Sequence, residues 1–92
     1  MNDYDTGLKD ASGLFKALSH PARLCIVNKL TTTSLNVKQM QECLGASQSS
    51  ISQHLTILKN RGIIEGKRVG SEVIYSLVDE RMRSLVKLFL QS

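Results

Sequence analysis

The chain has 92 residues, of which 41% are apolar, and this size allows one domain with a modest core but little room for a deep catalytic cleft. Its 12 Lys and Arg residues outnumber its 8 Asp and Glu residues, so the formal net charge of +4 favours a polyanion such as nucleic acid as partner. No apolar run approaches the roughly 20 residues of a membrane span, and the acidic residues 1–5 lack the apolar segment of a secretory signal. We therefore expect a cytoplasmic protein with no membrane partner, whose two cysteines are free thiols.

The first half of the chain is predicted to be helical. Apolar residues at helical spacing predict a first helix over about 6–18, and Pro21 suits the first turn of a second. After the connector 31–34, Asn36 can cap a third helix and Gln39 can reach back to that cap. Gly45 suits the position just past this helix, where the backbone commonly adopts a left-handed conformation. Residues 36–61 therefore predict a helix, a tight turn and another helix.

The helix predicted from residue 47 onward has two distinct faces. Its apolar residues recur at i, i+4 and i+7 and belong against a core, whereas its other face is polar but uncharged. A merely solvated helix usually carries Lys and Glu, but short amide and hydroxyl side chains can bond to base edges in a major groove. This pattern predicts a recognition helix, although the helix alone leaves an ordinary solvated face open. The apolar face holds Ile51, Leu55 and Leu58, and the polar face holds Ser49, Ser52, Gln53 and Thr56.

Beyond Gly62 the spacing of the apolar residues changes from about 3.6 residues to 2 residues. This change predicts a β-hairpin wing over about 63–77 with its turn at Gly70 and Ser71. Basic residues stand at the end of the recognition helix and near the hairpin tip. Each alone could be a solvated surface charge, but their grouping predicts contact with DNA phosphates. These residues are Lys59, Arg61, Lys67 and Arg68.

A last helix is predicted over about 79–91, with Asp79 as its cap. Its apolar face is widened by Leu88 and Leu90 beyond what one small domain would cover. This surplus predicts a dimer, the alternative being a face that folds back over its own core. The expected fold is a single domain over 1–92, mainly α with a small β-hairpin wing (α+β), a winged helix-turn-helix.

Three blocks of sequence read LSHPARL at 18–24, SQSSISQHL at 47–55 and VGSEVIYSL at 69–77. Together they resemble the ArsR/SmtB family of bacterial winged-helix repressors. The resemblance implies a homodimer formed by the first and last helices, with two recognition helices in successive major grooves of double-stranded DNA. It also implies base-reading residues at Gln48, Ser49, Ser52 and Gln53.

The resemblance does not extend to the metal ligands of many family members. The family's Cys-x-Cys positions fall on Asn36 and Lys38, which are not soft-metal ligands. The family's site on the last helix keeps Asp79, but Arg81 stands in the place of a histidine. The remaining candidates, two histidines and two cysteines, are interpreted as helix-packing residues, so no metal and no cofactor are expected. They are His20, His54, Cys25 and Cys43.

Cys25 and Cys43 also suggest a thiol switch. If the second and third helices run antiparallel about the connector, residues whose numbers sum to about 68 lie opposite each other, as these two do. Disulfide formation would then tilt the third helix and release DNA. The alternative is two small buried hydrophobic residues.

The residues predict a sequence-specific DNA-binding repressor whose operator and inducing signal the sequence does not indicate. The alternative is a winged-helix module for protein interaction, because a fold does not fix a function. Such a module tends to expose apolar or acidic residues on this helix, whereas this chain exposes Gln, Ser and Thr. Because no nucleophile is paired with a histidine at motif spacing and no glycine-rich phosphate loop is present, we do not expect an enzyme.

Overall fold

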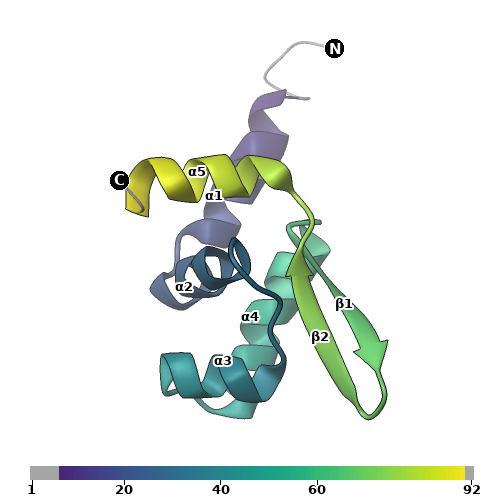
Figure 1. The fold of residues 1–92 in the computed structure, drawn as a ribbon. Helices are drawn as coiled ribbons and strands as arrows, with labels where there is room; N and C mark the ends of the chain where they lie inside the picture. The colour runs from purple at the N-terminus through teal and green to yellow at the C-terminus, as the bar shows by residue number, and fades with distance from the viewer. Residues whose placement is uncertain (1–6, 91–92) are drawn as a thin grey trace.

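A computed structural model describes residues 7–90, which form five helices and one antiparallel two-stranded hairpin (Figure 1). This is a winged helix-turn-helix, which confirms the predicted fold class. The ends of the predicted first and last helices, residues 6 and 91, lie outside the described residues. In chain order the elements are α1 Lys9–Leu18, α2 Pro21–Leu30, α3 Val37–Leu44, α4 Gln48–Asn60, β1 Ile64–Val69, β2 Glu72–Leu77 and α5 Glu80–Leu90.

Local hydrogen bonds define the helix-turn-helix. The Asn36 side chain accepts a hydrogen bond from the Gln39 N–H at 2.8 Å, and Gln39 Oε1 accepts one from the Asn36 N–H at 2.9 Å. This is the expected capping box. Gly45 follows α3 with a φ of 64°, and Ser47 Oγ then accepts from the Ser50 N–H at the start of α4. The tight turn between α3 and α4 is therefore fixed at both ends.

One cluster of buried apolar side chains joins the five helices and the base of the hairpin. The predicted stripe of α4 lies within it, since Ile51, Leu55 and Leu58 are all buried. Burying a side chain of this size contributes about 1.5–3 kcal/mol, so the rotation of α4 about its axis is strongly determined. The other members of the cluster are Ala17, Leu18, Ile26, Val27, Leu30, Leu35, Met40, Ile63, Ile64, Met82 and Val86.

The hairpin is attached to the segment that precedes α3. Its strands pair from Ile64 and Leu77 to the turn, where Gly70 has a φ of 65° as a type II′ turn requires. Leu35 and Tyr75 exchange two backbone hydrogen bonds of 3.1 and 2.8 Å, forming an isolated β-bridge. The wing therefore has a fixed position beside the helix-turn-helix, to the right of α3 and α4 in Figure 1.

The start of α5 is organised by Asp79. Its Oδ1 accepts from the Arg81 N–H at 3.0 Å, and the Arg81 guanidinium binds both carboxylate oxygens at 2.9 and 2.6 Å. This hydrogen bonding from Arg81 lowers the pKa of Asp79 below its ordinary value. Asp79 is therefore the predicted cap, and it carries an ion pair as well.

The outer face of α5 is not covered by any other part of residues 7–90. Met82 and Val86 point into the core, but Leu88, Phe89 and Leu90 are exposed. The alternative in which this face folds back over the core is therefore wrong. Within residues 7–90, no helix combines the length and the apolar character needed to cross a bilayer.

Candidate nucleic-acid interface

The four residues predicted to read bases are all exposed on α4, on the side opposite its core stripe. Ser49 Oγ lies 3.3 Å from Ser47 Oγ. The side chains of Gln48, Ser52 and Gln53 make no hydrogen bond with any part of residues 7–90, so their polar groups are available to a ligand.

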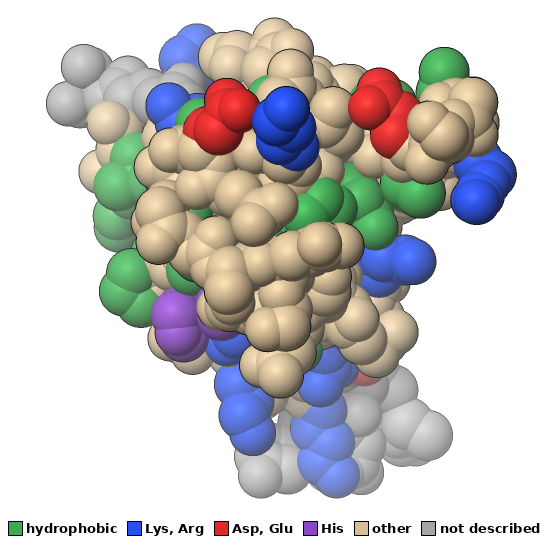
Figure 2. Space-filling model, turned by 90° about the horizontal axis from the view of Figure 1, so that it is seen from below, with side chains coloured by type: hydrophobic (Ala, Val, Ile, Leu, Met, Phe, Trp, Pro, Cys, Tyr) green, Lys and Arg blue, Asp and Glu red, His purple; other side chains and the backbone are tan. Residues whose placement is uncertain are grey.

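The face at the lower end of the molecule in Figure 1 combines α3, the start of α4 and the hairpin tip. Figure 2 shows this face from below, and most of its centre is backbone and uncharged polar side chains. Lys and Arg side chains stand around its margin, and Asp and Glu side chains stand among them along its upper edge. A polar surface bordered by cations suits a nucleic acid, because base edges offer donors and acceptors while the backbone offers phosphates.

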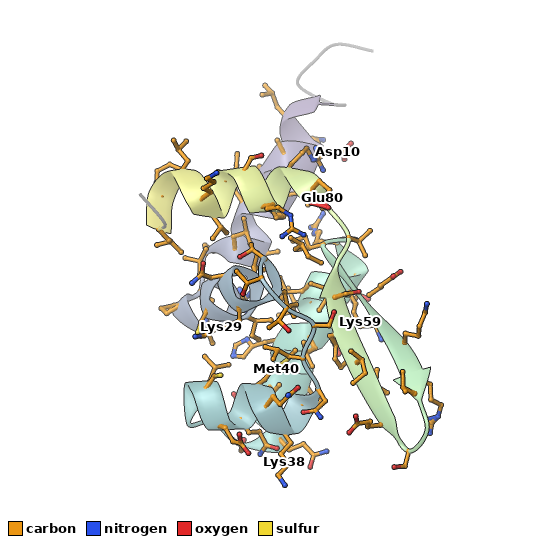
Figure 3. All side chains as sticks on the ribbon, viewed as in Figure 1. Asp10, Lys29, Lys38, Met40, Lys59 and Glu80 are labelled. Atoms are coloured by element: carbon orange, nitrogen blue, oxygen red, sulfur yellow. The ribbon has the colours of Figure 1, made fainter. Side chains whose placement is uncertain are left out.

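The predicted phosphate-binding residues are not all in one place. Lys67 and Arg68 lie next to each other on β1 but project from opposite faces of the hairpin, because side chains alternate along a strand. Lys59 is exposed in the last turn of α4 (Figure 3). The grouping of the four cations around one DNA-facing end therefore stays a prediction, and Arg61 lies near α1.

Arg61 lies against α1. A Cβ atom placed on Gly13 would clash with the Arg61 guanidinium, so the guanidinium lies close to the backbone of that helix. Helical periodicity alone does not reveal this contact. One signal was present, because a glycine inside a helix costs about 0.5–1 kcal/mol relative to alanine and can indicate a close approach.

A second group of titratable side chains joins α1, α2 and α4. His20 Nδ1 accepts from the Ala22 N–H at 3.0 Å and caps α2, and the His20 ring lies 4.5 Å from the His54 ring. Arg23 donates to the Ala17 carbonyl of α1 and, at 3.3 Å, to His54 Nδ1 of α4. Burial, His20 and Arg23 together lower the pKa of His54 from its ordinary value of 6.5. His54 is half-buried between the helices, whereas His20 is exposed and serves as the cap of α2.

The two cysteines differ in their surroundings, although both are free thiols. Cys25 is half-buried in α2, whereas Cys43 is exposed in α3. The interpretation of both as buried hydrophobic residues is therefore wrong for Cys43. Among residues 7–90, no group of three or more His, Cys, Asp and Glu side chains could hold a metal ion.

An apolar groove of about 370 Å³ runs between α1, α2 and α5. At its edges the side chains of Phe15 and Phe89 are 58% and 73% exposed. Exposed aromatic residues beside an apolar groove indicate a protein interaction surface. The groove is lined by Phe15, Leu18, Ser19, Leu24, Leu85, Val86, Phe89 and Leu90.

Comparison with known proteins agrees with this geometry. The family model described as "Bacterial regulatory protein, arsR family" matches residues 20–66, which include α2, α3, α4 and the start of β1. The chain belongs to the ArsR family. The relatives of this ArsR-family chain include the transcriptional repressor SmtB of Mycobacterium tuberculosis, which is 40% identical over 78 residues and 84% of this chain. The matched region is 58% of the length of SmtB.

Solved structures share the fold over nearly the whole of this ArsR-family chain. The transcriptional repressor BigR of Xylella fastidiosa has a TM-score of 0.87 at 29% identity, covering 99% of this chain and 95% of BigR. A fragment of Mb0332 from Mycobacterium bovis has a TM-score of 0.83 at 26% identity, covering 96% of this chain and 82% of the fragment. That fragment is described as a homodimeric winged helix-turn-helix DNA-binding domain.

Proposed function

We propose that this ArsR-family protein is a cytoplasmic, homodimeric transcriptional repressor that binds a pseudo-palindromic operator and acts by binding rather than by catalysis. One observation carries the proposal: α4 exposes an uncharged polar face on which the side chains of Gln48, Ser52 and Gln53 make no hydrogen bond within residues 7–90. SmtB and BigR are both named transcriptional repressors, which supports this reading.

In this proposal the start of α4 enters the major groove. Gln48, Ser49, Ser52 and Gln53 contact base edges, and an amide side chain can bind adenine through two hydrogen bonds. Lys59, Lys67 and Arg68 bind phosphates, which fixes the register of the protein on the duplex without reading sequence. Arg61 was predicted for the same role, and its guanidinium lies near Gly13 of α1.

The dimer is proposed to form through α1 and α5. Phe15 on α1 and Leu88, Phe89 and Leu90 on α5 are exposed in the single chain, beside the apolar groove. A second copy would bury these residues and place two α4 helices on one face of the DNA. The homodimeric description of the Mb0332 fragment supports this arrangement.

Footprinting of the purified protein on genomic DNA tests the proposal. We expect a protected pseudo-palindrome with half-sites about one helical turn apart, bound by a species that sediments as a dimer. Binding without any sequence preference would contradict the proposal and would favour a protein-interaction module.

We also propose that an oxidant acts through Cys25 and Cys43. Formation of a disulfide requires Cα atoms within about 4.4–6.8 Å, and this would move α3 and the turn that precedes α4. Mild oxidation should therefore weaken operator binding by the wild type but not by a Cys25→Ser variant. Equal binding by both proteins with and without oxidant would leave the cysteines without a regulatory role.

A further inference from the structure

Three basic side chains from separate parts of the chain line one cavity. Lys16 of α1, Arg23 of α2 and Arg61, the residue after α4, surround a space of about 270 Å³. Gly13, Ala17 and Ile57 complete its wall, so no acidic side chain lines it. Figure 2 shows Lys and Arg side chains gathered near the histidines, at one margin of the lower face.

No carboxylate within residues 7–90 neutralises these three cations. The ion pairs described there join Asp79 to Arg81 and Glu80 to Arg83. Asp10 lines the neighbouring cavity with Arg61 but is not paired with it. Like charges around one cavity repel each other, and an anion placed among them would remove that repulsion.

One of the three cations is held in place by hydrogen bonds, because Arg23 donates to the Ala17 carbonyl and to His54 Nδ1. The guanidinium of Arg61, which is exposed, lies close to Gly13 of α1. Little freedom of the Arg23 side chain therefore remains to be lost when an anion binds. The planar fork of a guanidinium matches the oxygens of a phosphate, and Lys16 adds an exposed point charge.

We propose that Lys16, Arg23 and Arg61 bind a phosphate group, supplied either by the DNA backbone beyond the reach of the wing or by free phosphate. Binding of a DNA phosphate rests on the proposed function, whereas binding of free phosphate does not. Lys16→Gln removes one of the three charges from an exposed position. Lys29→Gln is the matched control, because Lys29 is also exposed and lies in the last turn of α2 (Figure 3).

The first arm titrates inorganic phosphate into the DNA-free protein, with chloride at equal ionic strength as reference, and follows backbone amide shifts by NMR. If free phosphate is the ligand, saturable shifts should appear at Gly13, Ala17 and Arg23 in the wild type and in Lys29→Gln. These shifts should be lost in Lys16→Gln.

The second arm measures operator affinity against salt concentration. If a DNA phosphate is the ligand, Lys16→Gln should reduce the slope of log affinity against log salt by about 0.9 per subunit, and Lys29→Gln should not. The site is overturned if Lys16→Gln matches Lys29→Gln in both arms. If the wild type binds no operator at all, the proposed function fails, while the phosphate titration still decides the site.

Discussion

Three of the four residues predicted to read bases have side chains without a hydrogen bond to the rest of residues 7–90: Gln48, Ser52 and Gln53. Other hydroxyls of the same helix are engaged, since Thr56 donates to the Ser52 carbonyl and Ser49 approaches Ser47. An amide without an internal partner keeps both donor and acceptor for a base edge. Sequence discrimination should therefore depend most on the two glutamines.

Gln53→Ala tests this assignment directly. We expect it to cost about 1–3 kcal/mol on the cognate operator and little on random DNA, because base-edge contacts carry the sequence information. Arg68→Ala is the comparison and should weaken binding to both DNAs, because a phosphate contact is independent of sequence. Gel-shift titrations on both DNAs measure these losses. Equal losses from Gln53→Ala on the two DNAs would show that the reading face is misassigned.

His54 should make folding stability depend on pH. Burial, His20 and Arg23 lower the pKa of His54 in the folded state below its ordinary value of 6.5. As the pH falls below about 6.5, His54 is protonated in the unfolded chain before it is protonated in the folded protein. The free energy of unfolding that is present above about pH 6.5 is therefore progressively lost until the pH passes the lower pKa of His54 in the folded state. Urea denaturation at pH 7.5 and 5.5 should show a larger loss in the wild type than in His54→Gln. An equal loss in both would mean that His54 does not contribute.

Single residues with local partners could be predicted from the sequence, and those with distant partners could not. Asn36, Gln39 and Gly45 act within one helix and its ends, so their spacing in the sequence was sufficient to predict their roles. The contacts from Arg61 to Gly13 and from Arg23 to His54 join separate helices. No periodicity encodes such pairs, because they depend on how the helices pack.

At the level of elements, the hairpin was predicted together with its turn, but its attachment was not. Alternating residues and Gly70 determine how β1 and β2 pair. The wing is positioned by the bridge between Leu35 and Tyr75 and by a 3.2 Å hydrogen bond from Asn36 Nδ2 to Glu72 Oε2. The pattern predicts only a connector at residues 31–34, so nothing in it indicates that Leu35 is a strand partner.

Gly66→Ala should disturb this positioning. A Cβ at Gly66 would lie 2.9 Å from the Tyr75 ring and 2.9 Å from Val73 Cγ1, so the hairpin must shift. Crowding of this kind costs about 1–3 kcal/mol, which chemical denaturation would detect. Gly7→Ala is a suitable control, because its added Cβ would meet no atom within 4 Å among the described residues beyond its chain neighbours and its own helix backbone. Unchanged stability of Gly66→Ala would show that Tyr75 adjusts without cost.

At the scale of the whole molecule, the sequence predicted both a DNA-facing surface and an uncovered apolar face. The fold separates them, because α5 lies at the opposite end of the molecule from α3 and the hairpin tip (Figure 1). The exposed Phe15 and Phe89 therefore leave the DNA-facing surface clear. In the proposed dimer, which forms through α1 and α5, both copies of α4 would remain free to enter the DNA grooves.

Operator binding by such a dimer should depend strongly on salt. If each subunit neutralises about three or four phosphates, log affinity should fall against log salt with a slope of about −5 to −7. Fluorescence anisotropy with a labelled operator, measured over a range of chloride concentrations, gives this slope. A flat titration would contradict phosphate binding by the basic residues.

The central claim is that the uncharged face of α4 reads DNA sequence, and selection from a random DNA library tests it most directly. The wild type should enrich one pseudo-palindrome, and Gln53→Ala should relax the preference at the same position of each half-site. Enrichment of no motif by the wild type, or an identical motif from Gln53→Ala, would contradict the claim.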